Sequence, residues 1–125
     1  MGVVAVLVAS VAGFVVSSAW YTAFGTVWAG LSEAAAERPA PWKPAAEFVR
    51  TLALVTVFAG LSTAVGVGGV AGALGLALVL WVGFPVLILA GSVLHENVPV
   101  RLAALHAGDW LVKIVVVALV LGVWR

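Results

Sequence analysis

One segment near the C-terminus carries ionisable residues inside an otherwise apolar stretch. Asp109 and Lys113 are four residues apart with the acid first, and His106 stands one helical turn before Asp109. On a helix this spacing puts all three on one face, and the acid-first order favours an ion pair. Such a face could relay a proton or an ion, with His106 and Asp109 as relay groups and Lys113 as a charge gate. The cluster could equally be structural, with Asp109 and Lys113 neutralising each other and bonding Ser17 or Tyr21 of another helix.

The depth of these charges makes them costly. At 1.5 Å per residue, Asp109 and Lys113 lie about 10 Å and 16 Å along a helix from Leu102. In a hydrocarbon core about 30 Å thick the lysine would be near the middle, where each charge costs roughly 2.5–3.5 kcal/mol to insert. Both the functional and the structural interpretation can account for that cost, so both stay open.

Other chemistries are less well supported by the residue types and their spacing. His95, Glu96, His106 and Asp109 are possible metal ligands, but the first two lie three turns from the others, and Pro99 interrupts any H-E-x-x-H motif. No nucleophile elbow accompanies the Ser, His and Asp residues. We therefore expect no metal, no cofactor, no catalytic residue and no enzymatic activity.

The amino-acid composition indicates whether water or lipid surrounds this chain. Of its 125 residues 65% are hydrophobic and only 9% charged, too few to cover a water-facing surface. The mean hydropathy is +1.27. A lipid bilayer is the partner that such a chain needs. The net charge of +1 argues against nucleic acid, and the absence of cysteine excludes disulfides and thiol chemistry.

Hydrophobic stretches and turn residues divide the chain into spans. A helix needs about 20 apolar residues to cross the hydrocarbon core. A polar, proline-rich loop over 32–47 and the polar turn before Pro99 separate such stretches, while glycines near residue 66 mark a third turn. We expect an all-α, integral membrane four-helix bundle in a single domain, 1–125, with spans over about 3–28, 48–65, 70–94 and 100–124.

The basic residues are unevenly distributed between the two ends of these spans. Four spans place both termini on one side, with Arg125, and the polar loops on the other. The loop side carries Arg38, Lys43, Arg50 and Arg101. The positive-inside rule then predicts cytoplasmic loops and both termini outside.

Small residues and one proline suggest how the third span packs. Gly68, Gly72 and Gly75 form a stripe of the small-xxx-small kind, which predicts close helix packing inside the protomer or between copies. Homo-oligomerisation is therefore expected. Pro85 cannot donate a backbone hydrogen bond to the carbonyl of Trp81, so we expect a kink there.

Several aromatic and glycine positions resemble a known family. The shared positions are Trp20-Tyr21, Phe24-Gly25, Trp28, Trp81-Val82-Gly83-Phe84, Glu96, Ala107-Gly108, Trp110-Leu111, Gly122 and Trp124. Their order and spacing resemble small four-span bacterial membrane proteins of unknown function, number seventeen sixty-one among the domains of unknown function. The resemblance covers nearly the whole chain and implies the bacterial inner membrane.

The same resemblance separates family-wide residues from those particular to this chain. Trp20, Tyr21, Glu96 and Trp110 match the family pattern, whereas Asp109 and Lys113 depart from it together, like a paired addition. Two functions remain open. One is a small transporter or channel component for an unidentified ion or solute, with a pathway past His106, Asp109 and Lys113. The other is a non-transporting structural or accessory subunit of a membrane complex.

Overall fold

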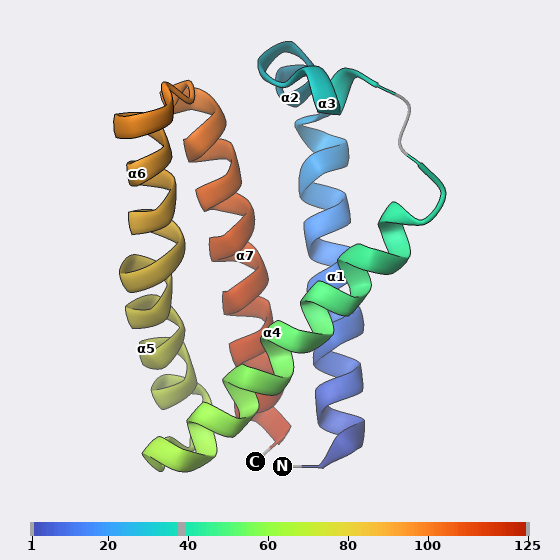
Figure 1. Ribbon diagram of the computed structural model, residues 1–125. Helices are drawn as coiled ribbons and strands as arrows, with labels where there is room; N and C mark the ends of the chain where they lie inside the picture. Colours follow the sequence, from blue (N-terminus) through green and yellow to red (C-terminus); the bar gives the residue numbers. More distant parts are fainter. Residues whose placement is uncertain (1, 38–39, 125) are drawn as a thin grey trace.

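The computed structural model describes residues 2–37 and 40–124, and every regular element in that part of the chain is a helix (Figure 1). The elements are α1 (Val3–Ala23), α2 (Gly25–Leu31), α3 (Glu33–Ala36), α4 (Lys43–Val65), α5 (Gly69–Trp81), the π-helical turn η1 (Val82–Val86), α6 (Leu87–Glu96) and α7 (Val100–Trp124). Four stretches are long and apolar enough to cross a membrane: α1, α4, the continuous segment Gly69–Glu96, and α7. The predicted all-α fold with four membrane spans is confirmed.

Helix α7 connects the two halves of the bundle. It packs along α1 on one side and along α5 and α6 on the other, while α4 packs against α1. Figure 1 shows α4 crossing the bundle obliquely, past the middle of α1 and on to the α4–α5 turn. The termini and the α4–α5 turn lie at one end of the bundle, and α2, α3 and the α6–α7 turn lie at the other. We call these the terminal end and the loop end.

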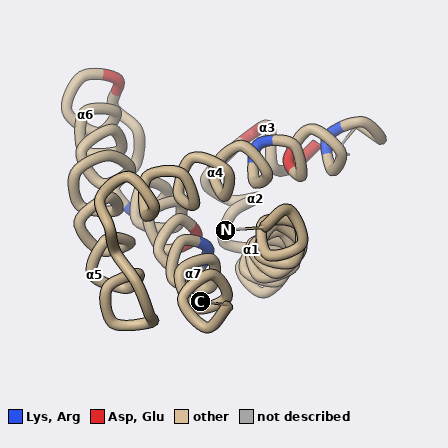
Figure 2. Tube along the Cα trace, turned by 90° about the horizontal axis from the view of Figure 1, so that it is seen from below, with Lys and Arg blue, Asp and Glu red and all other residues tan. Residues whose placement is uncertain are grey.

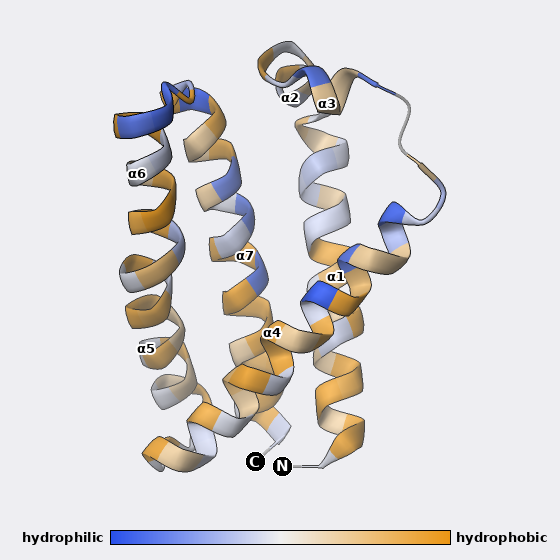
Figure 3. Ribbon diagram, in the orientation of Figure 1, coloured by the Kyte–Doolittle hydropathy of each residue, from blue (hydrophilic) through white to orange (hydrophobic). Residues whose placement is uncertain are grey.

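The apolar core occupies the half of the bundle nearer the terminal end. Alanines dominate on α1 and α5, which lets the helix backbones approach closely in the absence of a hydrophobic drive between helices in lipid. The buried cluster consists of Ala5, Ala9, Val55, Phe58, Ala59, Ala73, Ala77, Ile114, Val117, Ala118 and Leu121. Figure 3 shows the contrast with the loop end, where hydrophilic residues appear on α7 and on the first turns of α4.

Two elements differ from those expected. The first helix ends at Ala23 and resumes at Gly25, with Phe24 at φ −103° and ψ 18° between the two. Helix α4 begins at Lys43 rather than near residue 48. Pro44 permits this early start, because the first turn of a helix does not use its backbone N–H groups. The charged residues Lys43, Glu47 and Arg50 therefore belong to helix α4 and not to the preceding loop.

The turns and the proline follow the expected backbone chemistry. Gly66 and Gly69 adopt positive φ angles of 80° and 74° in the α4–α5 turn, a conformation that a Cβ disfavours. Pro85 lies inside η1, so the expected break in α-helical hydrogen bonding takes the form of a π-helical turn.

Close packing inside the protomer uses glycines other than those of the expected stripe. A Cβ at Gly68 or Gly75 would meet nothing within 4 Å, and one at Gly72 would meet only the nearby Val67 side chain. By contrast, a Cβ at Gly122 would lie 2.8 Å from the Cα of Val70. The stripe therefore makes no helix–helix contact in the protomer, because α5 turns Ala73 and Ala77 inward instead. Contact between copies stays a prediction.

Replacing Gly122 by alanine should destabilise the α5–α7 pair. The added methyl group would press on backbone rather than on a flexible side chain, so the helices must move apart, at a cost of about 1–3 kcal/mol. The free energy of unfolding in mixed micelles, measured by titration with dodecyl sulfate, tests this. Gly75→Ala is the matched control and should be neutral. A loss at Gly75 equal to that at Gly122 would contradict the packing described here and favour contact between copies through the stripe.

Candidate functional site

Polar side chains of α1 and α7 meet in the half of the bundle nearer the loop end. The hydroxyl of Ser17 donates to Oδ1 of Asp109 at 2.6 Å. One turn further along α1, the Tyr21 hydroxyl lies 2.5 Å from Nδ1 of His106. These two pairs join residues that share one face of each helix, because Ser17 and Tyr21, like His106 and Asp109, are about one turn apart. The contact between α1 and α7 is therefore polar in this half of the bundle and apolar in the half nearer the terminal end.

Lys113 is the buried cation of the site. Its side chain is 4% exposed, and its Nζ lies 3.2 Å from Oε1 of Glu47 and 4.0 Å from Oδ2 of Asp109. The ammonium also lies 5.4 Å from the ring centre of Trp110, within the range of a cation–π contact. One lysine therefore faces two carboxylates from different helices, α4 and α7.

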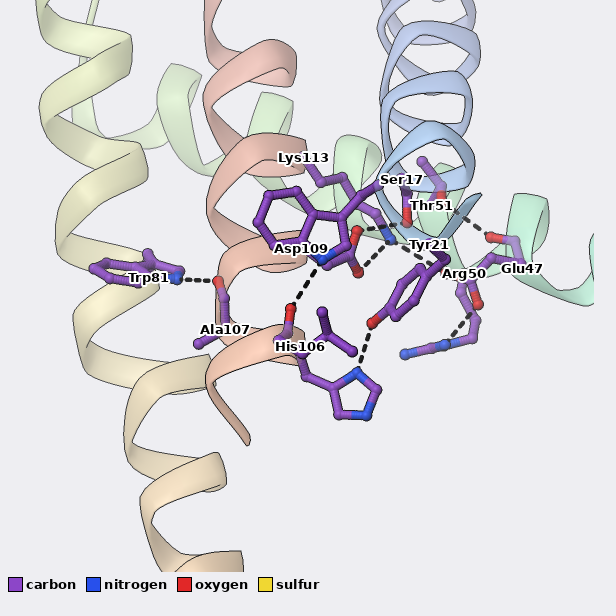
Figure 4. A network of polar contacts seen from close by, with 12 residues as sticks. Ser17, Tyr21, Glu47, Arg50, Thr51, Trp81, His106, Ala107, Asp109 and Lys113 are labelled. Atoms are coloured by element: carbon purple, nitrogen blue, oxygen red, sulfur yellow. Dashed lines mark hydrogen bonds and ion pairs between the residues drawn. The ribbon is translucent and has the colours of Figure 1, made fainter. Parts of the chain in front are cut away.

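Glu47 extends the network onto the exposed side of α4. Its Oε2 accepts a hydrogen bond of 2.7 Å from Arg50, and its backbone carbonyl accepts one from the Thr51 hydroxyl at 3.0 Å. Figure 4 shows Ser17, Asp109, Lys113 and Glu47 directed toward one another, with α1, α7 and α4 around them. Figure 2 shows the same charges seen along the bundle, on α7 and along the first turns of α4.

Glu47 and Arg50 were missed as site residues in the sequence. Glu47 falls in the stretch expected to be a polar loop, and the sequence presents Arg50 only as a loop-side charge. The available signal was Pro44, since a proline followed by a long apolar run also fits the first turn of a helix. A helix beginning there carries Glu47 and Arg50 on adjacent turns, where they can pair.

Aromatic residues hold α7 from both sides through its backbone. The indole Nε1 of Trp20 donates to the Leu105 carbonyl at 3.0 Å, and that of Trp81 donates to the Ala107 carbonyl at 2.9 Å. The Trp20 ring lies where a Cβ on Gly108 would be, so this glycine makes room for it. Figure 4 places Trp81 on the opposite side of α7 from the charged network. Trp20 and Trp81 therefore position α7 through its backbone, and Trp81 does so from the side away from the network.

Glu96 takes no part in this arrangement. It is exposed and ends α6 at the loop end, beside Asn97, which has a φ of 55°. Of the sequence-derived candidates, the structure brings together Ser17, Tyr21, His106, Asp109 and Lys113, and it leaves Glu96 apart.

A cavity of about 630 Å³ lies along the network. Its walls come from α1, α2, α4, α6 and α7, and they combine charged, hydroxyl and aromatic groups. The lining residues are Phe14, Ser17, Ser18, Tyr21, Trp28, Lys43, Pro44, Glu47, Arg50, Leu89, His106, Asp109, Trp110 and Lys113. The size is that of a small-molecule site.

The donor set offers little to a metal ion. Within residues 2–37 and 40–124, no group of three His, Cys, Asp or Glu side chains is placed to hold one. Over the same residues, every buried side-chain nitrogen or oxygen has a hydrogen-bond partner. The arrangement can instead bind charged groups and exchange ion-pair partners around Lys113.

Comparison with protein families finds one described as "Protein of unknown function (DUF1761)", whose family model matches residues 4–122. Neither the curated proteins nor the solved structures provide a match.

Proposed function

We propose a transport role for this chain, which belongs to the DUF1761 family of proteins of unknown function. In this proposal the protein is a small transporter component that admits an ion or small solute to the cavity between α1, α4 and α7. Asp109 and Lys113 form the inner end of that cavity, and His106 and Tyr21 line the approach to it.

The observation that carries the proposal is the pairing of buried charge with accessible volume. Asp109 and Lys113 are 5% and 3% exposed, yet both line a cavity of about 630 Å³. Ionisable side chains inside a membrane are expensive and typically mark ion or substrate pathways. A purely structural ion pair would need no space beside it.

The apolar core indicates how such a transporter must work. From Lys113 toward the terminal end, α7 continues with Ile114, Val117, Ala118 and Leu121, all buried in the core cluster. Cargo at Asp109 would meet this apolar barrier, so passage requires a second conformation. Release of Glu47 from Lys113 would free the first turns of α4 from α7 and is the movement that we propose.

The orientation forms part of the same proposal. The cavity includes Trp28 of α2 and Lys43 at the start of α4, both nearer the loop end than the terminal end. With the loops in the cytoplasm and both termini outside, the cavity would open toward the cytoplasm of a bacterial cell.

Flux in proteoliposomes tests the transport role. We expect the wild-type protein to carry protons, a monovalent inorganic ion or a small carboxylate above the rate of empty liposomes, as followed with ion-sensitive dyes and radiolabel. Asp109→Asn should lower this flux by about tenfold or more, because it removes a charge from the inner end of the cavity.

The matched control is Glu96→Gln, an equivalent acid-to-amide change at an exposed position outside the cavity. Its flux should equal that of the wild type. Absence of flux for all these cargoes, with folded protein in the vesicles, would refute the transport role.

A non-transporting accessory role is the second candidate. This role is favoured by the buried apolar core. It is also favoured because, within the described residues, every buried side-chain nitrogen or oxygen has a hydrogen-bond partner. In that case Asp109 and Lys113 would only join helices, flux would stay at the level of empty liposomes, and the cavity would hold no cargo.

A further inference from the structure

The charges that line the cavity do not cancel. Lys43, Arg50 and Lys113 supply three formal positive charges against the two negative charges of Glu47 and Asp109, which leaves +1 with His106 neutral. The unbalanced positive charge lies on the first turns of α4, because Lys43 and Arg50 are exposed whereas Asp109 and Lys113 are buried.

Both carboxylates of the cavity already face cations of the protein. Glu47 receives Arg50 at one oxygen and Lys113 at the other, at 2.7 Å and 3.2 Å. Asp109 receives the Ser17 hydroxyl at 2.6 Å and faces Lys113 across 4.0 Å. A cationic guest would therefore meet carboxylates that already face Arg50 and Lys113.

The donors, in contrast, retain capacity. The Lys43 side chain has no hydrogen bond or ion pair within the part of the chain that the structure describes. Arg50 uses one terminal nitrogen for Glu47, and its side chain is 66% exposed, so other guanidinium N–H groups remain. A neutral His106 that accepts from Tyr21 at Nδ1 carries its proton on Nε2, which adds another donor.

The remaining wall is apolar and largely aromatic. Phe14, Trp28 and Trp110 line the cavity together with Pro44 and Leu89. Rings of this kind suit a flat or chain-like apolar body, while the free donors suit a negatively charged head.

We infer that the cavity binds the carboxylate or phosphate group of a small amphipathic anion, held by Lys43 and Arg50, with its apolar body against Phe14 and Trp28. The inference rests on the cavity of the proposed function and names the class of molecule that this cavity takes. Two sources present this chemistry: a water-soluble anion such as an aromatic carboxylate, and the headgroup of an anionic phospholipid.

Two probes of equal shape and opposite charge test the inference. Benzoate and benzylammonium are titrated calorimetrically into wild-type protein in phosphatidylcholine nanodiscs. We expect benzoate to bind about tenfold more tightly or better, because its carboxylate meets unoccupied charged donors. Equal or tighter binding of benzylammonium would overturn the inference.

Charge-removing variants identify the donors. Lys43→Gln and Arg50→Gln should each weaken benzoate binding by about tenfold, since each loses a charge-assisted hydrogen bond. Lys43→Gln removes no hydrogen bond or ion pair among the described residues, so we expect this variant to fold like the wild type. Arg101→Gln, an exposed cation at the start of α7 outside the cavity, is the matched control and should bind like the wild type. Unchanged affinity in both cavity variants would overturn the inference.

The lipid in the nanodisc then separates the two sources. If phosphatidylglycerol lowers the affinity for benzoate in the wild type but not in Lys43→Gln, the headgroup competes for the site and the anion comes from the bilayer. If phosphatidylglycerol has no effect, the site serves a water-soluble anion. Either result supports an anion site.

Binding and flux are separate readouts, so the two proposals can fail independently. Selective benzoate binding without any flux would retain the anion site and refute the transport role. Flux of a cation without preference for benzoate would retain transport and refute the anion site.

Discussion

Replacing Lys113 by methionine should destabilise the protein much more than replacing Asp109 by asparagine. Lys113 faces two carboxylates, Glu47 and Asp109, so its loss leaves Asp109 without a balancing cation inside the bundle, while Glu47 keeps only Arg50. Removal of one partner from a buried ion pair costs roughly 3–5 kcal/mol. In Asp109→Asn, Lys113 keeps Glu47 at 3.2 Å and the amide oxygen can still accept from Ser17, so we expect a loss of only about 1 kcal/mol.

The comparison is made by titration of each variant with dodecyl sulfate in mixed micelles. Adding Glu47→Gln and Asp109→Asn to Lys113→Met removes both carboxylates that faced the lysine and should recover most of the lost free energy of unfolding. Equal losses in the two single variants would contradict the shared role of Lys113. No recovery in the triple variant would show that packing of the lysine chain, rather than its charge, stabilises this region.

This asymmetry has a practical consequence for the functional experiments. A variant that folds but lacks the buried acid is needed to separate transport from assembly. Asp109→Asn meets this requirement, because Lys113 keeps its ion pair with Glu47 and the Ser17 hydroxyl can still donate to the amide oxygen. Lys113→Met does not.

Much of the site on α1 and α7 could be predicted from the sequence because it depends on helical periodicity. The spacing of His106, Asp109 and Lys113 puts them on one face of any regular helix. Ser17 and Tyr21 form the corresponding polar face of the first span, and two polar faces in lipid favour contact with each other. The structure accordingly places Ser17 at Asp109 and Tyr21 at His106.

The contribution of α4 could not be predicted in this way. Its position depends on where the helix begins and on the angle at which it crosses α1, and neither is encoded in a local pattern. Prolines near residue 41 favour a loop, and Glu47 with Arg50 then belongs to a solvated segment. The oblique course of α4 brings Glu47 to the middle of α7 instead, where it becomes the closest carboxylate to Lys113.

The glycines at which helices pack closely could not be predicted from a local pattern either. A stripe such as Gly68, Gly72 and Gly75 predicts that another helix can approach closely. It does not predict which helix does so. The close approaches in the protomer occur at Gly108, under the Trp20 ring, and at Gly122, against the backbone of α5. Both are isolated glycines on α7 without a repeating pattern.

The transport role requires that the polar cavity connects the charged network with water. The chain has no cysteine, so a single introduced thiol is the only reactive one. Ser18→Cys places that thiol in the wall of the cavity. A thiol must ionise to react with a methanethiosulfonate reagent, and it does so only where water reaches it.

Two controls on α1 bracket this measurement. Ala9→Cys places the thiol in the apolar core, and Val15→Cys places it about one turn before Ser18, at an exposed position that does not line the cavity. Neither position should offer water to a thiol in a bilayer.

The decisive measurement is therefore the rate at which sulfonatoethyl methanethiosulfonate modifies the three single-cysteine variants in proteoliposomes. We predict that Ser18→Cys reacts on the order of 100-fold faster than Ala9→Cys and Val15→Cys. We also predict that benzoate slows the reaction at Ser18→Cys alone. A rate at Ser18→Cys as low as at Ala9→Cys would contradict the account, because the network would then be dry and the charges would serve only to hold the helices together.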